Sequence, residues 1–234
     1  MSGPLARAFV VSLSALSILA GCAALDVGYS ETVANQAMLA SVAPLRVVVG
    51  TVADRRVDTT RIGTKTDDDE AIVTRRPVTD IVREALMVEL TKNGHTVVSE
   101  RGDVVLAAQV EEFWVDAVRT SSATLYLGRV AIALVVADGR TGTLLLTRRY
   151  VGVKRREGED DSKALRREVL DGALARILHE LATDPDLIAT LARRPSVLMQ
   201  WPLTWDTSAH SAAVGASAPC SGHHCLGRSS RPTC

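Results

Sequence analysis

The residues best suited to metal chemistry lie close to the end of the chain. Cys220 and Cys225 flank His223 and His224, and Cys234 follows them. Thiolate and imidazole are ligands that zinc and copper accept readily. The spacing of the first two cysteines also permits a disulfide, which an oxidising compartment would favour. Three interpretations stay open: a metal site, a Cys220–Cys225 disulfide, and a tail without a defined role.

A second group of possible metal ligands is the acidic run from Asp67 to Glu70. Clustered carboxylates favour Ca²⁺, but the glycine spacing of an EF-hand is missing, and a solvated acidic loop is the alternative. The sequence has no G-x-S-x-G motif, and His179 lacks a second histidine four residues later, so neither a serine hydrolase nor a zinc protease motif is present. We therefore expect a protein that is not an enzyme and needs no bound cofactor.

The first 21 residues have the pattern of an export signal. Arg7 precedes the apolar stretch Ala8–Ala20, which as a helix would be about 20 Å long, too short for the roughly 30 Å core of a bilayer. The following Leu19-Ala20-Gly21-Cys22 resembles the lipobox of bacterial lipoproteins. The resemblance implies cleavage between Gly21 and Cys22, and acylation of Cys22 with chains such as palmitate.

An acylated Cys22 would fix the protein to a membrane, because each buried CH₂ contributes about 0.8 kcal/mol and several chains hold almost irreversibly. Ala23 follows the cysteine, where lipoproteins retained in the inner membrane of enteric bacteria tend to have Asp. By that resemblance we expect the protein to be anchored in the outer membrane, with its folded part facing the periplasm.

The composition restricts what the folded part can bind. The 234 residues carry 27 basic and 27 acidic side chains, so the net charge is zero. Proteins that bind nucleic acid normally have a basic excess, so we expect no nucleic-acid partner. Apolar residues make up 47% of the chain, which is enough to bury a core.

The elements that position these residues follow from the hydrophobic pattern. We expect a signal peptide at 1–21, a lipidated tether at 22–44, one α+β domain at 45–194 and a disordered tail at 195–234. Residues 53–76 are polar and predict a long exposed loop. Within the domain, the apolar spacing indicates strands near 45–52, 95–99, 103–115, 124–137 and 144–155, with helices at 77–94 and 162–183 and a short helical stretch after Asp184-Pro185.

The order β-α-β-β-β-β-α predicts two layers, a mainly antiparallel sheet of about five strands with two helices on one face. In the strand at 103–115, alternation places Val104, Leu106, Ala108, Val110 and Trp114 on one face and Gln109 and Glu111 on the other.

The domain resembles the YajG-like bacterial lipoproteins, and three stretches carry the resemblance. They are Val47 to Arg56, Ile62-Gly63-Thr64, and Leu90 to Gly94, with Glu111 to Trp114 similar as well. The resemblance implies a lipid-anchored envelope protein with a small α/β domain and no established activity.

Asp54, Arg55 and Gly63 match the YajG-like pattern and are the candidate binding residues. The alternative is a purely structural role, with Asp54 in an Asx turn and Gly63 at a positive φ.

These observations favour a non-enzymatic envelope lipoprotein whose domain binds another envelope component. A second hypothesis is an auxiliary subunit of a lipid or solute export machine, which would expose an apolar groove or an edge strand. A third is a hydrolase with an unrecognised site. The sequence predicts neither the partner nor the oligomeric state.

Overall fold

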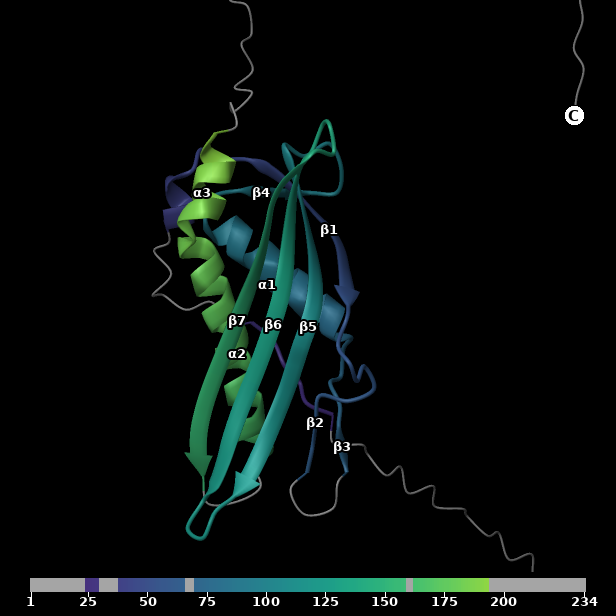
Figure 1. Cartoon of the computed structure of the whole chain (residues 1–234), viewed down its shortest axis with the longest axis vertical. Helices are drawn as coiled ribbons and strands as arrows, with labels where there is room; N and C mark the ends of the chain where they lie inside the picture. The colour runs from purple at the N-terminus through teal and green to yellow at the C-terminus, as the bar shows by residue number, and fades with distance from the viewer. Residues whose placement is uncertain (1–23, 30–37, 66–69, 159–161, 194–234) are drawn as a thin grey trace, which may run out of the picture. The chain divides into compact units, whose positions relative to one another are not determined.

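The computed structural model describes residues 24–29, 38–65, 70–158 and 162–193. They form a seven-stranded sheet with helices against one face (Figure 1). The elements are η1 (Met38–Ser41), β1 (Arg46–Asp54), β2 (Gly63–Thr64), β3 (Ala71–Ile72), α1 (Val78–Lys92), β4 (Thr96–Val98), β5 (Val104–Arg119), β6 (Thr124–Asp138), β7 (Leu144–Gly158), α2 (Lys163–Thr183) and α3 (Pro185–Ala192). This confirms the predicted two-layer α+β class.

The sheet has an antiparallel part and a parallel part. β5, β6 and β7 form a long antiparallel meander, in which Trp114 pairs with Arg129 and Arg129 with Val153. β1 lies between β4 and β5 and runs parallel to both, because α1 carries the chain back across the sheet. The sheet is therefore mainly antiparallel, as predicted, but its first strand pairs in parallel.

The prediction of an exposed loop at 53–76 is wrong in part. β1 continues to Asp54, and the short strands β2 and β3 pair with each other. Ile62 and Ile72 are buried, and Gly63 pairs with Val115 of β5. Ile62 stands alone among polar residues, and the run Ala71-Ile72-Val73 is too short for a period that would reveal a strand.

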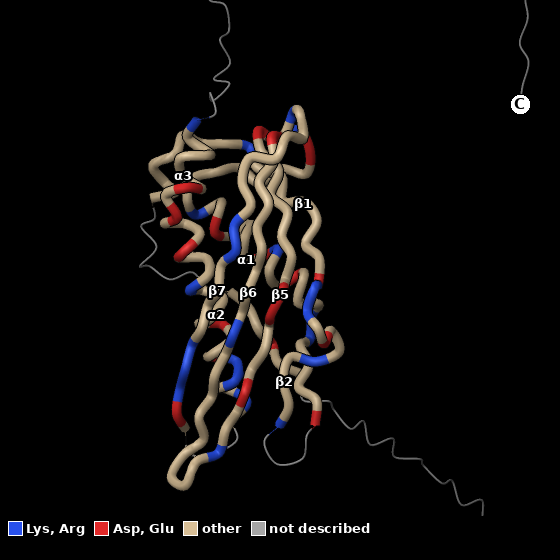
Figure 2. Tube along the Cα trace, in the orientation of Figure 1, with Lys and Arg blue, Asp and Glu red and all other residues tan. Residues whose placement is uncertain are grey.

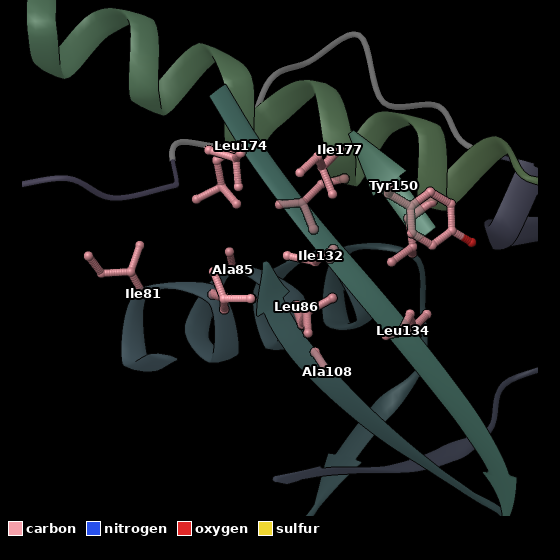
Figure 3. Close-up of a cluster of buried hydrophobic side chains, with 14 of the residues drawn as sticks. Ile81, Ala85, Leu86, Ala108, Ile132, Leu134, Tyr150, Leu174 and Ile177 are labelled. Atoms are coloured by element: carbon pink, nitrogen blue, oxygen red, sulfur yellow. The ribbon is translucent and has the colours of Figure 1, made fainter. Parts of the chain in front are cut away.

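Both long helices bury the faces that the sequence predicted. Figure 3 shows Ile81, Ala85 and Leu86 of α1 and Leu174 and Ile177 of α2 pointing toward side chains of β5, β6 and β7. Two glycines let α2 approach the sheet closely: a Cβ on Gly128 would lie 2.4 Å from the Val169 carbonyl oxygen, and one on Gly152 would lie 2.0 Å from that of Ala173. The core therefore lies between the helices and one face of the sheet.

The ends of the helices have the predicted stop and start residues. The Ser162 side chain accepts from the Leu165 N–H at the start of α2, and Asp184 does the same for Asp186 at the start of α3. α1 ends at Asn93, and Gly94 follows with a φ of 88°. Among the described residues, none of the helices combines the length and the apolar character needed to cross a membrane.

The predicted face of β5 is wrong at Trp114. The pairing of β5 with β6 shifts between Val110 and Glu112, so Glu111 is the extra residue of a β-bulge. Beyond it the alternation reverses: Phe113 and Val115 are buried, and Trp114 lies on the face away from the helices. The bulge thus exposes an aromatic ring on the outer face of the sheet.

The prediction of a free tether at 22–44 is also wrong for the described residues within it. Leu25 and Val27 are each 1% exposed, and Leu39 and Val42 are buried as well. The Leu25 N–H donates to the Val73 carbonyl at 2.8 Å, and the Arg75 N–H donates to the Leu25 carbonyl at 3.0 Å. We call residues 24–29 the strap, because they run across the domain as part of its core.

Candidate functional site

A hollow of about 420 Å³ lies on the outer face of the sheet, beside the bulge in β5. The loop after β1 forms its rim, and the strands β5, β6 and β7 form its floor. Its lining residues are Arg56, Val57, Asp58, Arg61, Glu111, Glu112, Phe113, Trp114, Arg129 and Arg149. We call this the Trp114 hollow.

The floor of the Trp114 hollow is a network of ion pairs around the indole. Arg129 donates to Glu112 at 2.7 Å and its guanidinium lies 2.8 Å from Asp116. The hydrogen bond to Glu112 raises the pKa of Arg129, despite the opposing effect of burial. The Trp114 indole N–H donates to Asp116 at 2.7 Å, so the orientation of the ring is fixed. Arg61 lies over the ring, 5.8 Å from its centroid.

The rim of the hollow is held by a second set of pairs. The Arg56 guanidinium donates to both oxygens of Asp54 and to the carbonyl of Arg61, so it crosses the base of the loop. Burial raises the pKa of Asp54, but the hydrogen bonds from Arg56 outweigh it and the pKa is lowered. Hydrogen bonds from Thr60 and then Arg61 lower the pKa of Asp58 to about 2. The rim therefore stays charged and ordered at neutral pH.

The structure gives each predicted binding residue a different position. Asp54 supports the rim by accepting from Arg56, including its backbone N–H at 3.2 Å, as in an Asx turn. Arg55 has an exposed side chain, while its N–H donates to the Val110 carbonyl at 2.8 Å. A Cβ on Gly63 would lie 2.4 Å from the Val115 carbonyl oxygen, so a close approach requires this glycine. None of the three lines the Trp114 hollow.

The two histidines among the described residues have different surroundings. His179 is exposed on α2. His95 is buried before β4, and its Nδ1 accepts from the Leu45 N–H at 3.3 Å. Burial lowers the pKa of His95, against the opposing effect of the Leu39 backbone. Among the described residues, neither histidine belongs to a cluster of side chains that could bind a metal ion.

Several predicted sites fall outside the described residues. They are Gly21 and Cys22, the acidic residues Asp67 to Asp69, and the tail residues Cys220, His223, His224, Cys225 and Cys234. Glu70 is described, and it pairs with Lys65. Within the described ranges no three His, Cys, Asp or Glu side chains gather as a metal site would require.

The residues that make the hollow were largely missed by sequence reasoning. Arg61 and Arg129 have no motif, since their roles arise from contacts between distant segments. One signal was present: Glu112, Trp114 and Asp116 alternate along β5, and polar residues at every second position mark a solvent-facing strand. Chemically, the hollow presents an aromatic ring and guanidinium groups held in place by carboxylates, an arrangement that can bind a ligand by stacking and hydrogen bonding.

The comparisons with known proteins agree with this fold. Residues 34–192 match the model of a family described as uncharacterized lipoprotein. None of the curated proteins matches the chain. A crystal structure of a protein from Xanthomonas campestris has a TM-score of 0.50 and 15% identity, over 70% of this chain and 93% of that chain. At this identity the likeness shows the fold alone.

Two further solved structures are similar over most of their own length. A minor lipoprotein from Acinetobacter baumannii has 16% identity and a TM-score of 0.34, over 60% of this chain and 92% of that chain. A PelC variant from Paraburkholderia phytofirmans, which is a dodecamer, has 14% identity and a TM-score of 0.33, over 68% and 92%.

Proposed function

The chain belongs to this family of uncharacterised bacterial lipoproteins, and we propose that acyl chains on Cys22 anchor it in the outer membrane with its domain facing the periplasm. The family match and the Leu19-Ala20-Gly21-Cys22 pattern support the anchor. Ala23 supports the outer membrane, since the residue after the cysteine is not Asp. The stretches shared with the YajG-like proteins support that subgroup within the family.

The domain acts by binding another component of the envelope, without catalysis and without a cofactor beyond the covalent lipid. The observation that carries this proposal is the Trp114 hollow, in which an oriented indole lies beside arginines already fixed by carboxylates. A site ordered before binding loses little side-chain entropy when a ligand enters. Val57 on the rim is fully exposed, which adds an apolar contact for a partner.

The anchor is tested by replacing Cys22 with Ser in the producing bacterium. We expect wild-type protein in the outer-membrane fraction with the added mass of acyl chains, and the variant without that mass and away from the membrane. A variant that still fractionates with membranes, with the same mass difference from its sequence as wild type, contradicts the anchor.

The binding role is tested by in-cell photo-crosslinking from position 57, followed by mass spectrometry of the trapped neighbour. Position 87 is the matched control, because Met87 is also an exposed apolar residue but lies on α1, across the sheet from the hollow. We expect a discrete adduct from position 57 that Trp114→Ala weakens several-fold. An adduct that is equal at both positions, or unaffected by Trp114→Ala, counts against the hollow.

A second candidate function is an auxiliary subunit of an envelope export machine, and one observation favours it. Among the described strands, β7 pairs only with β6, so one side of a strand running from Leu144 to Gly158 is available for another strand. Val151 and Val153 are exposed on it, between arginines and a lysine (Figure 2). Co-purification with a transporter after mild detergent extraction would support this function, and a monomer without partners would contradict it.

A further inference from the structure

The strap is fixed to the domain from its first residues. Leu25 forms a parallel bridge with Thr74 and exchanges backbone hydrogen bonds with Val73 and Arg75, so it acts as an added strand beside the segment after β3. Its side chain and that of Val27 are each 1% exposed. Burying two such side chains contributes about 1.5 to 3 kcal/mol each, which opposes local release of this segment.

The other end of the strap is held by the helices. The Gly28 N–H donates to the Asp171 carboxylate of α2 at 3.0 Å, and the Tyr29 hydroxyl donates to Glu89 of α1 at 2.6 Å. Glu89 is fully buried and also accepts from the Asn93 side chain at 2.8 Å. The strap is thus fastened to the sheet at one end and to both helices at the other.

This fastening leaves almost no spacer between the domain and Cys22. Two trans peptide units separate Cys22 from Ala24, so their Cα atoms are at most about 7.6 Å apart. A flexible tether over 23–44 would instead have given a root-mean-square reach of about 25 Å. An acyl group on Cys22 therefore brings the strap's first residues to the headgroup layer.

We infer that the surface around the start of the strap rests against the phospholipid headgroups of the membrane that holds the anchor, an inference that depends on the proposed acylation of Cys22. Beside the strap, residues 73–79 and the loop after β1 line a second hollow of about 310 Å³. We call this the anchor surface. Arg61, Arg75 and Arg76 line it, and guanidinium groups bind phosphate groups well. Arg61 also pairs with Asp58 and Arg76 with Glu84, so a phosphate would join existing ion pairs at these two arginines.

The charge and exposure of the anchor surface suit this contact. Arg75 is exposed next to Thr74, the residue that bridges to Leu25. The loop after β1 carries Arg55, Arg56 and Arg61 beside one acidic residue, Asp58 (Figure 2). This surface shares Arg56 and Arg61 with the Trp114 hollow, so the same contact would place the candidate binding site next to the membrane.

The opposite end of the sheet lies away from the anchor. β2 pairs with β5 at Val115, which pairs with Gly128 of β6. β6 then runs ten further residues to Asp138, a distance of about 33 Å at the usual rise per residue. The hairpin between β6 and β7 therefore serves as an internal reference for distance from the bilayer.

The test uses the full acylated chain in phosphatidylethanolamine and phosphatidylglycerol vesicles that contain a headgroup spin-labelled lipid. Cys220, Cys225 and Cys234 are replaced with Ser, and a fluorophore is attached to Thr59→Cys on the anchor surface or to Thr141→Cys on the distant hairpin. We expect the spin label to quench position 59 several-fold more than position 141. Inserting about twenty Gly and Ser residues between Ala23 and Ala24 should abolish that difference, because the domain then reaches about 25 Å from the surface.

Equal quenching at the two positions in acylated protein overturns the inference while leaving the proposed anchor intact. A difference that survives the insertion overturns the short connection as the cause of the contact, since the anchor surface would then hold to the headgroups by itself. If mass spectrometry finds Cys22 without acyl chains, both the anchor and the inference fail.

Discussion

Replacing Leu25 with Ala tests whether the strap is part of the cooperative core. Leu25 is 1% exposed, and Leu→Ala at such positions costs about 2 to 5 kcal/mol. Its hydrogen bonds to Val73 and Arg75 are made by the backbone, so the substitution removes packing alone. Against a usual total of about 5 to 15 kcal/mol, this is a large fraction of the free energy of unfolding.

The assay is urea unfolding of the mature chain carrying Cys22→Ser, with and without Leu25→Ala. We expect a lower midpoint with an unchanged slope, and a melting temperature lower by about 2 to 4 °C for each kcal/mol lost. Asp26→Ala is the matched control, because its side chain is exposed and surface changes stay within about 0.5 kcal/mol. A Leu25→Ala effect no larger than that of the control would refute the assignment of the strap to the core.

Three further predictions concern packing and pH. Gly63→Ala should lower the free energy of unfolding by about 1 to 3 kcal/mol or more in urea titrations, because the new Cβ would lie 2.4 Å from the Val115 carbonyl oxygen. Gly152→Ala should lower the free energy of unfolding by at least as much, since its Cβ would lie 2.0 Å from the Ala173 carbonyl oxygen. This variant should fractionate with membranes as the wild type does, because Cys22 is unchanged. Because burial lowers the pKa of His95 from 6.5, the contribution of His95 to the free energy of unfolding should be constant above that pH and fall below it, and His95→Gln should remove this part of the slope between pH 7.5 and 5.

The helices and the antiparallel strands could be predicted because their signals are local. The stripe from Val169 to Leu181 repeats at helical spacing, and the large buried residues of β6 fall at every second position from Val130 to Val136, with only the small Ala131 buried between them. Ser162 and Asp184 carry cap chemistry that acts within three residues. In such segments the residue pattern and the burial follow the same period, so one implies the other.

The pairing of β1, the strap and the bulge could not be predicted, because they depend on contacts between distant segments. The parallel pairing of β1 with β4 and β5 is set by the path of α1 across the sheet, which no single strand encodes. The strap offers only Leu25 and Val27 among small and polar residues, too few for a recognisable period. The bulge at Glu111 shows in the sequence only as the adjacent polar pair Glu111-Glu112, which does not reveal a shift of register until the pairing partner is known.

The bulge explains both the wrong prediction for the face of Trp114 and the position of its indole in the candidate site. Without the extra residue, strict alternation would direct Trp114 toward the helices and Phe113 to the outer face. With it, the indole reaches Asp116 and lies under Arg61, beside the loop that ends at the buried Ile62. The strap holds the segment after β3 next to that same loop, across the second hollow. Two departures from the local pattern therefore lie at the Trp114 hollow and at the strap, on either side of the same loop, and the photo-crosslinking and quenching experiments test the two proposals that depend on them.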